Sequence, residues 1–113
     1  MVPWVLLGAH AMPLVELQVL PLGTGSPSVS EYVAEAVKVI AEKSEEYKVT
    51  PMSTVFKVKD LSKACEIIKE IESKLKEKGV KRVVIMMRVD DRFDKDLDMD
   101  RKVQSVMKRL ENP

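Results

Sequence analysis

The segment 82–90 constrains the fold more than any other part of this 113-residue chain. It alternates with period two, which is typical of a β-strand, but both of its faces are largely apolar. One face carries Val83, Ile85, Met87 and Val89, and the other carries Val84, Met86 and Arg88. Such a strand needs cover on two sides. A single domain of this length has helices enough for one side of a sheet, so we expect the second side to meet another copy of the chain.

The first elements of the chain read as a strand followed by a helix. Residues 14–20 alternate as a half-buried strand, and Glu16 and Gln18 point to the side opposite its apolar residues. After a loop, Ser28 and Glu31 form a capping box that predicts the start of a helix, which runs to about residue 43.

The second half of the chain repeats this order. Residues 47–59 favour strand but are interrupted by Pro51, which predicts two strands or one sharply bent strand. Asp60 is expected to cap a helix that ends at Gly79, and Asp98 to cap a last helix. Together with the strand at 82–90, these elements predict an α+β fold, a ferredoxin-like βαββαβ antiparallel sheet with an additional C-terminal helix.

Apolar side chains mark one face of each predicted helix. The three stripes are Val29, Val33, Val37 and Ile40, then Ala64, Cys65, Ile68, Ile71 and Leu75, then Val103, Val106, Met107 and Leu110. Because Cys65 falls within a stripe, we expect it to pack in the core rather than to act as a nucleophile.

Residues 1–12 are interpreted as a short N-terminal appendage or a misplaced start, and residues 13–113 as a single ferredoxin-like domain. The first eleven residues carry no charged side chain, so the basic region of an export signal is missing. Their apolar run is also far shorter than the roughly 20 residues that cross a bilayer. We therefore expect a cytoplasmic protein without a membrane partner.

Composition argues against several functions. The 19 Lys and Arg residues are balanced by 18 Asp and Glu residues, and aromatic residues make up 4%, which disfavours nucleic-acid binding. Cys65 and His10 are the only soft metal ligands, too few for a zinc site, an iron–sulfur site or a disulfide. With no nucleophile–base pair and no metal cluster, we predict no catalytic residues, no metal site, no cofactor and no enzyme.

Two loops have the composition of ligand sites. The loop from Gly23 to Ser28 joins two glycines and several hydroxyls to a helix start, which suits either a polar ligand or a tight turn. The segment 90–100 holds six of the seven aspartates and resembles the opening of a calcium loop, but Met99 and Ser105 stand where Gly and Glu are required. We interpret it as a solvated loop whose charges pair with one another.

Four runs of residues, taken together and in order, resemble the thiamine-binding-protein family of small ferredoxin-like proteins. They are residues 19–30, with Gly23-Thr24-Gly25-Ser26-Pro27-Ser28 at their centre, then Thr50-Pro51-Met52-Ser53-Thr54, then Lys81-Arg82-Val83, then residues 89–95. The resemblance extends from about residue 14 to residue 110. The chain departs from the family pattern at Ser53, where the family has Gly, so backbone geometry or access is expected to differ there.

The resemblance implies a homo-oligomer, a dimer through sheet faces and often a tetramer, that binds thiamine or its hydroxymethylpyrimidine moiety near a subunit boundary. The candidate ligand-binding residues are Glu16, Gln18, Gly23, Thr24, Ser26, Ser30, Met52, Thr54, Met86, Arg88 and Asp90. Carboxylates suit the positive thiazolium, amide and hydroxyl groups suit the aminopyrimidine, and methionines give adaptable apolar contact. Each of these residues also has a plain structural interpretation, and the alternative function is a structural or regulatory homo-oligomer with a different ligand or none.

Overall fold

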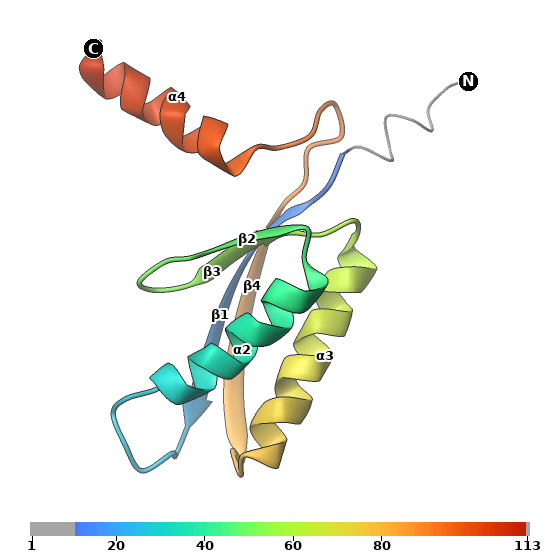
Figure 1. Cartoon of the computed structure of the whole chain (residues 1–113), viewed down its shortest axis with the longest axis vertical. Helices are drawn as coiled ribbons and strands as arrows, with labels where there is room; N and C mark the ends of the chain where they lie inside the picture. Colours follow the sequence, from blue (N-terminus) through green and yellow to red (C-terminus); the bar gives the residue numbers. More distant parts are fainter. Residues whose placement is uncertain (1–10, 113) are drawn as a thin grey trace.

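The computed structural model describes residues 11–112 and has the predicted order of strands and helices (Figure 1). The elements are β1 (Leu14–Leu22), α2 (Ser30–Lys43), β2 (Glu46–Val49), β3 (Thr54–Lys57), α3 (Leu61–Glu77), β4 (Arg82–Asp90) and α4 (Met99–Glu111). The four strands form one antiparallel sheet in the order β2-β3-β1-β4. This is the ferredoxin-like α+β fold with an additional C-terminal helix, as the sequence predicted.

The two neighbours of β1 pair with it over different lengths. β1 pairs with β4 along all nine residues of both strands. Its pairing with β3 runs only from Leu14, opposite Lys57, to Leu17, opposite Thr54. The break predicted at Pro51 is confirmed, because residues 50–53 form a turn between two four-residue strands. The second half of β1 therefore continues past the end of β3.

The core lies between the sheet and the helices α2 and α3, which cover one sheet face (Figure 1). Its largest fully buried side chains come from all three components: Phe56, Leu17, Ile40, Ile67, Ile71, Leu75, Val15 and Val58. The other sheet face is only partly covered. We call the part formed by Glu16, Gln18, Leu20, Val84, Met86 and Arg88 the open face, because these alternate positions of β1 and β4 point away from the core.

One prediction about the first helix is wrong, and another is confirmed only in part. α2 begins at Ser30 with Val29 as its N-cap, and no side chain caps it, so the predicted capping box does not form. The hydroxyls of the preceding loop bond locally instead: Ser28 N–H donates to Ser26 Oγ at 3.1 Å. The buried residues of α2 are Ala36, Val39 and Ile40, so the predicted stripe is confirmed at Ile40, whereas its valines Val33 and Val37 are only partly buried.

In α3 the predicted ends are confirmed but one core residue is wrong. Asp60 caps the helix by accepting a hydrogen bond from Lys63 N–H at 3.0 Å, and Gly79 follows its end with φ +88°. The buried stripe is Ala64, Ile67, Ile71 and Leu75. Cys65 is exposed, because Ile67 rather than Cys65 faces the sheet, while Ile68 is partly buried against the core.

The last helix stands away from the layer formed by α2 and α3 (Figure 1). Asp98 caps α4 as predicted, accepting from Arg101 N–H at 2.9 Å. The Cα radius of gyration is 16.5 Å, against about 13 Å for a compact chain of this length. No helix within residues 11–112 is long and apolar enough to span a membrane. The predicted N-terminal appendage lies outside the described residues, except for Ala11 and Met12.

Candidate functional site

A cavity of about 240 Å³ opens where β1 runs past the end of β3. We call it the edge cavity. Its walls come from β1, from α2 and from the 50–53 turn, and the residues that line it are Leu17, Gln18, Val19, Leu20, Val29, Val33, Ala36, Ile40, Thr50, Pro51, Met52, Ser53 and Thr54. The cavity thus occupies the position that a longer β3 would fill beside β1.

The 50–53 turn is held in place from both ends. Within the turn, Thr50 N–H and Thr50 Oγ1 both donate to the carbonyl oxygen of Ser53 at 2.8 Å. Across the cavity, Gln18 Nε2 donates to the carbonyl oxygen of Met52 at 3.2 Å. Gln18 therefore connects β1 to the turn at the point where the two backbones separate.

The edge cavity combines apolar walls with a few polar groups. Val33, Ala36 and Ile40 of α2 form one wall, and Leu17 forms part of the opposite one. The Gln18 amide and the hydroxyls of the 50–53 turn lie along the rim. Small-molecule sites in proteins have this character, because apolar walls supply affinity and a few polar groups fix orientation.

A second group of candidate residues forms a charged cluster beside the cavity. Glu16 accepts a hydrogen bond from Ser53 Oγ at 3.0 Å. It also forms an ion pair with Arg88, whose Nε lies 3.3 Å from its carboxylate. Asp90 pairs with Lys102 of α4 at 3.0 Å. These residues, except Ser53, border a separate hollow of about 310 Å³. Glu16 is thus occupied by two partners, one of which belongs to the turn that borders the edge cavity.

The structure separates the predicted site residues into three groups. Gln18, Met52 and Thr54 line the edge cavity, with Thr54 buried and Met52 exposed. Glu16, Arg88 and Asp90 form the charged cluster, and Met86, opposite Gln18 in the strand register, is exposed on the open face.

The remaining candidates, Gly23, Thr24, Ser26 and Ser30, belong to the glycine loop and the start of α2 and do not line the edge cavity. Gly23 and Gly25 adopt φ +71° and +80°, as a tight turn requires. The loop leads into Val29, which does line the cavity.

Sequence reasoning missed the wall that α2 contributes to the cavity, which is formed by Val33, Ala36 and Ile40. The sequence did carry a signal for the cavity. The strand that begins at residue 14 is longer than the short strands beside Pro51, so part of one of its edges remains unpaired.

The predicted pairing within the acidic loop holds for Arg92 and Asp94, but Asp96 pairs with Lys57 of β3 and Asp100 with Lys48 of β2, both outside the loop. Arg92 makes two contacts with Asp94, at 2.7 and 2.6 Å, and holds the pKa of that carboxyl below its usual value. The hydrogen bond from Arg101 N–H lowers the pKa of Asp98. For Asp96, burial opposes ionisation, but hydrogen bonds from Lys57 Nζ at 2.8 Å and Met12 N–H at 3.0 Å outweigh it and lower its pKa. These carboxylates are already engaged in holding the loop and the start of α4.

Similar proteins extend over nearly the whole chain. A family model described as thiamine-binding protein matches residues 15–107. The UPF0045 protein YqgV of Bacillus subtilis is 36% identical over 104 residues, covering 88% of this chain and 99% of its own. A UPF0045 protein of Methanothermobacter thermautotrophicus is 35% identical over 99 residues, covering 88% of this chain and 100% of its own.

Solved structures agree with the fold. A crystal structure of the Methanocaldococcus jannaschii protein MJ1052 superposes with a TM-score of 0.75 at 31% identity, covering 86% of this chain and 97% of that one. A Thermotoga maritima protein, described as a candidate for thiamine biosynthesis or salvage, gives a TM-score of 0.70 at 21% identity, covering 84% and 98%, and supports the fold alone. From the matched family model and these relatives, the chain belongs to the thiamine-binding protein family.

Proposed function

We propose that this protein binds thiamine or its hydroxymethylpyrimidine moiety in the edge cavity, without chemically transforming it. The observation that carries the proposal is the cavity itself: an apolar slot rimmed by amide and hydroxyl groups, in a chain that belongs to the thiamine-binding protein family. Its volume of about 240 Å³ lies just below the range of about 300–1,000 Å³ typical of drug-sized ligands. A ligand of one or two rings suits this size.

The chemistry of the rim matches an aminopyrimidine. The faces of that ring are apolar and suit the walls formed by Leu17, Val33 and Ile40. Its edge carries both donors and acceptors, and the Gln18 amide offers both as well, through its oxygen and the N–H that is not bonded to Met52. Met52, which is 77% exposed at the turn, is a flexible side chain that can close over a bound ring.

A larger hollow elsewhere is a poorer match for thiamine. It measures about 440 Å³ and lies between the end of α3 and the start of β4. Four cationic side chains and one carboxylate border it: Lys69, Lys76, Lys81, Arg82 and Glu72. This excess of positive charge repels a thiazolium ring, whereas the edge cavity has the Glu16 carboxylate nearby, bonded to Ser53 of its rim.

The proposal includes self-association through the open face, which places the ligand near a subunit boundary. Leu20 is 40% exposed and Met86 is 49% exposed on this face. Gln18 projects from the same side of β1 as Leu20 and also borders the edge cavity. A second copy covering the open face would therefore lie beside the cavity. These exposed apolar residues equally favour the alternative, an oligomer with a structural or regulatory role and a different ligand or none.

Calorimetric titration tests the proposal. We expect saturable heat with thiamine, with hydroxymethylpyrimidine or with both. Val33→Phe, which fills the cavity from α2, should lower the affinity at least tenfold, whereas Gln104→Ala on α4 should bind like the wild type. Circular dichroism checks that Val33→Phe remains folded.

The absence of heat from the wild type with either ligand at millimolar concentration would reject ligand binding and leave the structural alternative. Unchanged affinity in folded Val33→Phe would place the ligand elsewhere. Chromatography of the ligand after incubation should recover it intact, and a converted product would contradict the non-enzymatic part of the proposal.

A further inference from the structure

The hollow of about 440 Å³ between the end of α3 and the start of β4 is strongly cationic. We call it the cationic hollow. The charged and hydroxyl side chains that border it are Lys69, Glu72, Ser73, Lys76, Lys81 and Arg82. Four positive charges and one negative charge give it a net charge of +3, although the whole chain carries only +1. Positive charge is therefore concentrated at this one place on the surface.

Two segments of the chain build the cationic hollow. The residues that α3 contributes are three or four positions apart, which places them on one flank of the helix: Lys69, Glu72, Ser73 and Lys76. After α3 the chain turns at Gly79, where φ is +88°, and returns as β4 (Figure 1). This turn brings Lys81 and Arg82 to the other side of the hollow. The positive side chains thus converge from two directions.

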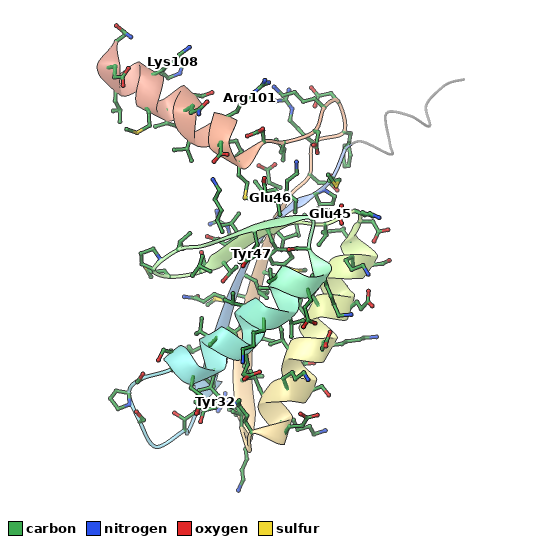
Figure 2. All side chains as sticks on the ribbon, in the orientation of Figure 1. Tyr32, Glu45, Glu46, Tyr47, Arg101 and Lys108 are labelled. Atoms are coloured by element: carbon green, nitrogen blue, oxygen red, sulfur yellow. The ribbon has the colours of Figure 1, made fainter. Side chains whose placement is uncertain are left out.

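The four positive side chains of the hollow have no counter-charge. Within residues 11–112, none of them forms an ion pair. Other lysines nearby do: Lys63 of α3 pairs with Glu66 at 2.9 Å, and Lys78 pairs with Glu35 at 3.8 Å. Figure 2 shows the carboxylates of Glu45 and Glu46 at the opposite end of α3, too far away to neutralise the hollow.

The end of the helix explains only one of these positive charges. Basic residues in the last turn of a helix stabilise its dipole, and the effect falls off within that turn. Lys76 lies in the last turn of α3. Lys69 lies two turns before the end of this helix, and Lys81 and Arg82 follow it in the chain. The other three charges therefore require another explanation.

We propose that the cationic hollow binds a small molecule that carries a phosphate or diphosphate group. Lysine ammonium groups and the planar guanidinium of Arg82 donate charge-assisted hydrogen bonds to phosphate oxygens, and the Ser73 hydroxyl adds a neutral donor. A diphosphate ester carries about three negative charges at neutral pH, which balance the net charge of the hollow.

The hollow also has room for an organic group beside the phosphate. Its volume of about 440 Å³ lies within the range of about 300–1,000 Å³ typical of small-molecule sites. Leu75, Val80 and Val83 supply an apolar part of its lining. The hollow shares no lining residue with the edge cavity, and it suits a ligand of opposite charge. The proposal therefore adds a second site to the one in the proposed function.

Nuclear magnetic resonance of ¹⁵N-labelled protein tests where a phosphate compound binds. We expect inorganic pyrophosphate to shift the amide signals of residues 80–83 saturably, with a Kd of about 1 mM or below. The amide signals of Met52 and Ser53, at the edge cavity, should not move. Sulfate at the same ionic strength should bind more weakly, because it carries fewer charges and oxygens. No saturable shift at residues 80–83, or equal affinity for sulfate, would overturn the proposal.

Two double variants test whether the residues of the hollow bind the phosphate. Lys76→Gln with Arg82→Gln removes two charges from the hollow, and Lys74→Gln with Lys108→Gln removes two from exposed positions outside it. The first pair should lower the affinity for pyrophosphate at least about tenfold, and the second pair by less than about threefold. Circular dichroism checks that both variants are folded. Equal losses would show attraction by overall charge alone and would refute a site in the hollow.

A second probe distinguishes a free phosphate ligand from an esterified one. Tighter binding of adenosine 5′-diphosphate than of pyrophosphate would support a ligand whose organic group contacts the apolar lining, and equal binding would support recognition of the phosphates alone. Binding of a DNA duplex but of neither probe would refute the proposal in favour of a nucleic-acid surface. Because these titrations contain no thiamine, their failure leaves the proposed function intact, and absence of thiamine heat would leave the phosphate site intact.

Discussion

The ion pair between Lys57 and Asp96 gives the sharpest prediction about the attachment of α4. The Lys57 side chain is 10% exposed, that of Asp96 is 38% exposed, and Nζ and Oδ2 are 2.8 Å apart. Asp96→Asn removes the charge but keeps an oxygen that can accept the hydrogen bond from Met12 N–H. The change therefore leaves a nearly buried ammonium group without a counter-charge.

The geometry sets the size of the effect. At 2.8 Å and an effective dielectric constant of about 20, the attraction is about 6 kcal/mol. Desolvation of Lys57 and the partial exposure of Asp96 offset most of it, so we expect Asp96→Asn to lower the free energy of unfolding by about 1–3 kcal/mol. Lys57→Met should cost less, under about 1 kcal/mol, because the carboxylate left behind is better hydrated and the new side chain packs.

Urea unfolding followed by circular dichroism measures both changes, at one protein concentration because the proposed self-association would shift the midpoint. Asp94→Asn is the control: it removes a carboxylate that pairs with Arg92 in the same loop, and its midpoint should match the wild type. Equal losses of unfolding free energy for Asp96→Asn and Lys57→Met, or no loss for Asp96→Asn, would refute the argument that the buried Lys57 ammonium needs its counter-charge.

The same pair predicts how acid affects the fold. The pKa of Asp96 is lowered in the folded protein, so its carboxylate contributes stability above the unfolded pKa of about 3.9. That contribution disappears as pH falls through the lower folded pKa. The difference in unfolding free energy between the wild type and Asp96→Asn should therefore be constant near neutral pH and shrink below about pH 4.

Two further predictions concern α3 and its end. Ile67→Ala, at a fully buried position, should lower the free energy of unfolding by about 2–5 kcal/mol, whereas Cys65→Ala, at an exposed one, should change it by less than about 0.5 kcal/mol. If urea unfolding showed a larger loss for Cys65→Ala than for Ile67→Ala, the assignment of Cys65 to the surface would be wrong. Gly79→Ala should lower the free energy of unfolding by about 1–2 kcal/mol through backbone strain at φ +88°. Steric clashes add nothing to this cost, because nothing lies within 4 Å of the added Cβ. Gly79→Asn should cost less, and equal midpoints for glycine and alanine would contradict the left-handed turn.

The strands could be predicted from the sequence because their signals are local. Period-two alternation identified β1 and β4, and Pro51 separated β2 from β3. The phase of the helices could not be predicted equally well. In α3, stripes through Cys65 or through Ile67 both fit helical spacing, and the contact with the sheet selects Ile67. A shift of one residue turns a helix by about 100°, so an exposed cysteine was assigned to the core.

The candidate site shows the same division between local and non-local signals. Gln18, Met52 and Thr54, which their types and their motif suggested as candidates, line the edge cavity. The α2 wall depends on which side of α2 meets β1, and the cavity depends on where the β1–β3 pairing ends. Neither is encoded in a short segment, because both follow from how distant parts of the chain pack.

Ser53 shows how a departure from the family motif is accommodated. Glycine is required in a turn only where φ is positive, and within residues 11–112 only Gly23, Gly25 and Gly79 have positive φ. Ser53 therefore adopts the turn without that strain, and its hydroxyl gains a hydrogen bond to Glu16 at 3.0 Å. Since Glu16 also pairs with Arg88 of the open face, the substitution adds a link between the rim of the edge cavity and the surface that we assign to self-association.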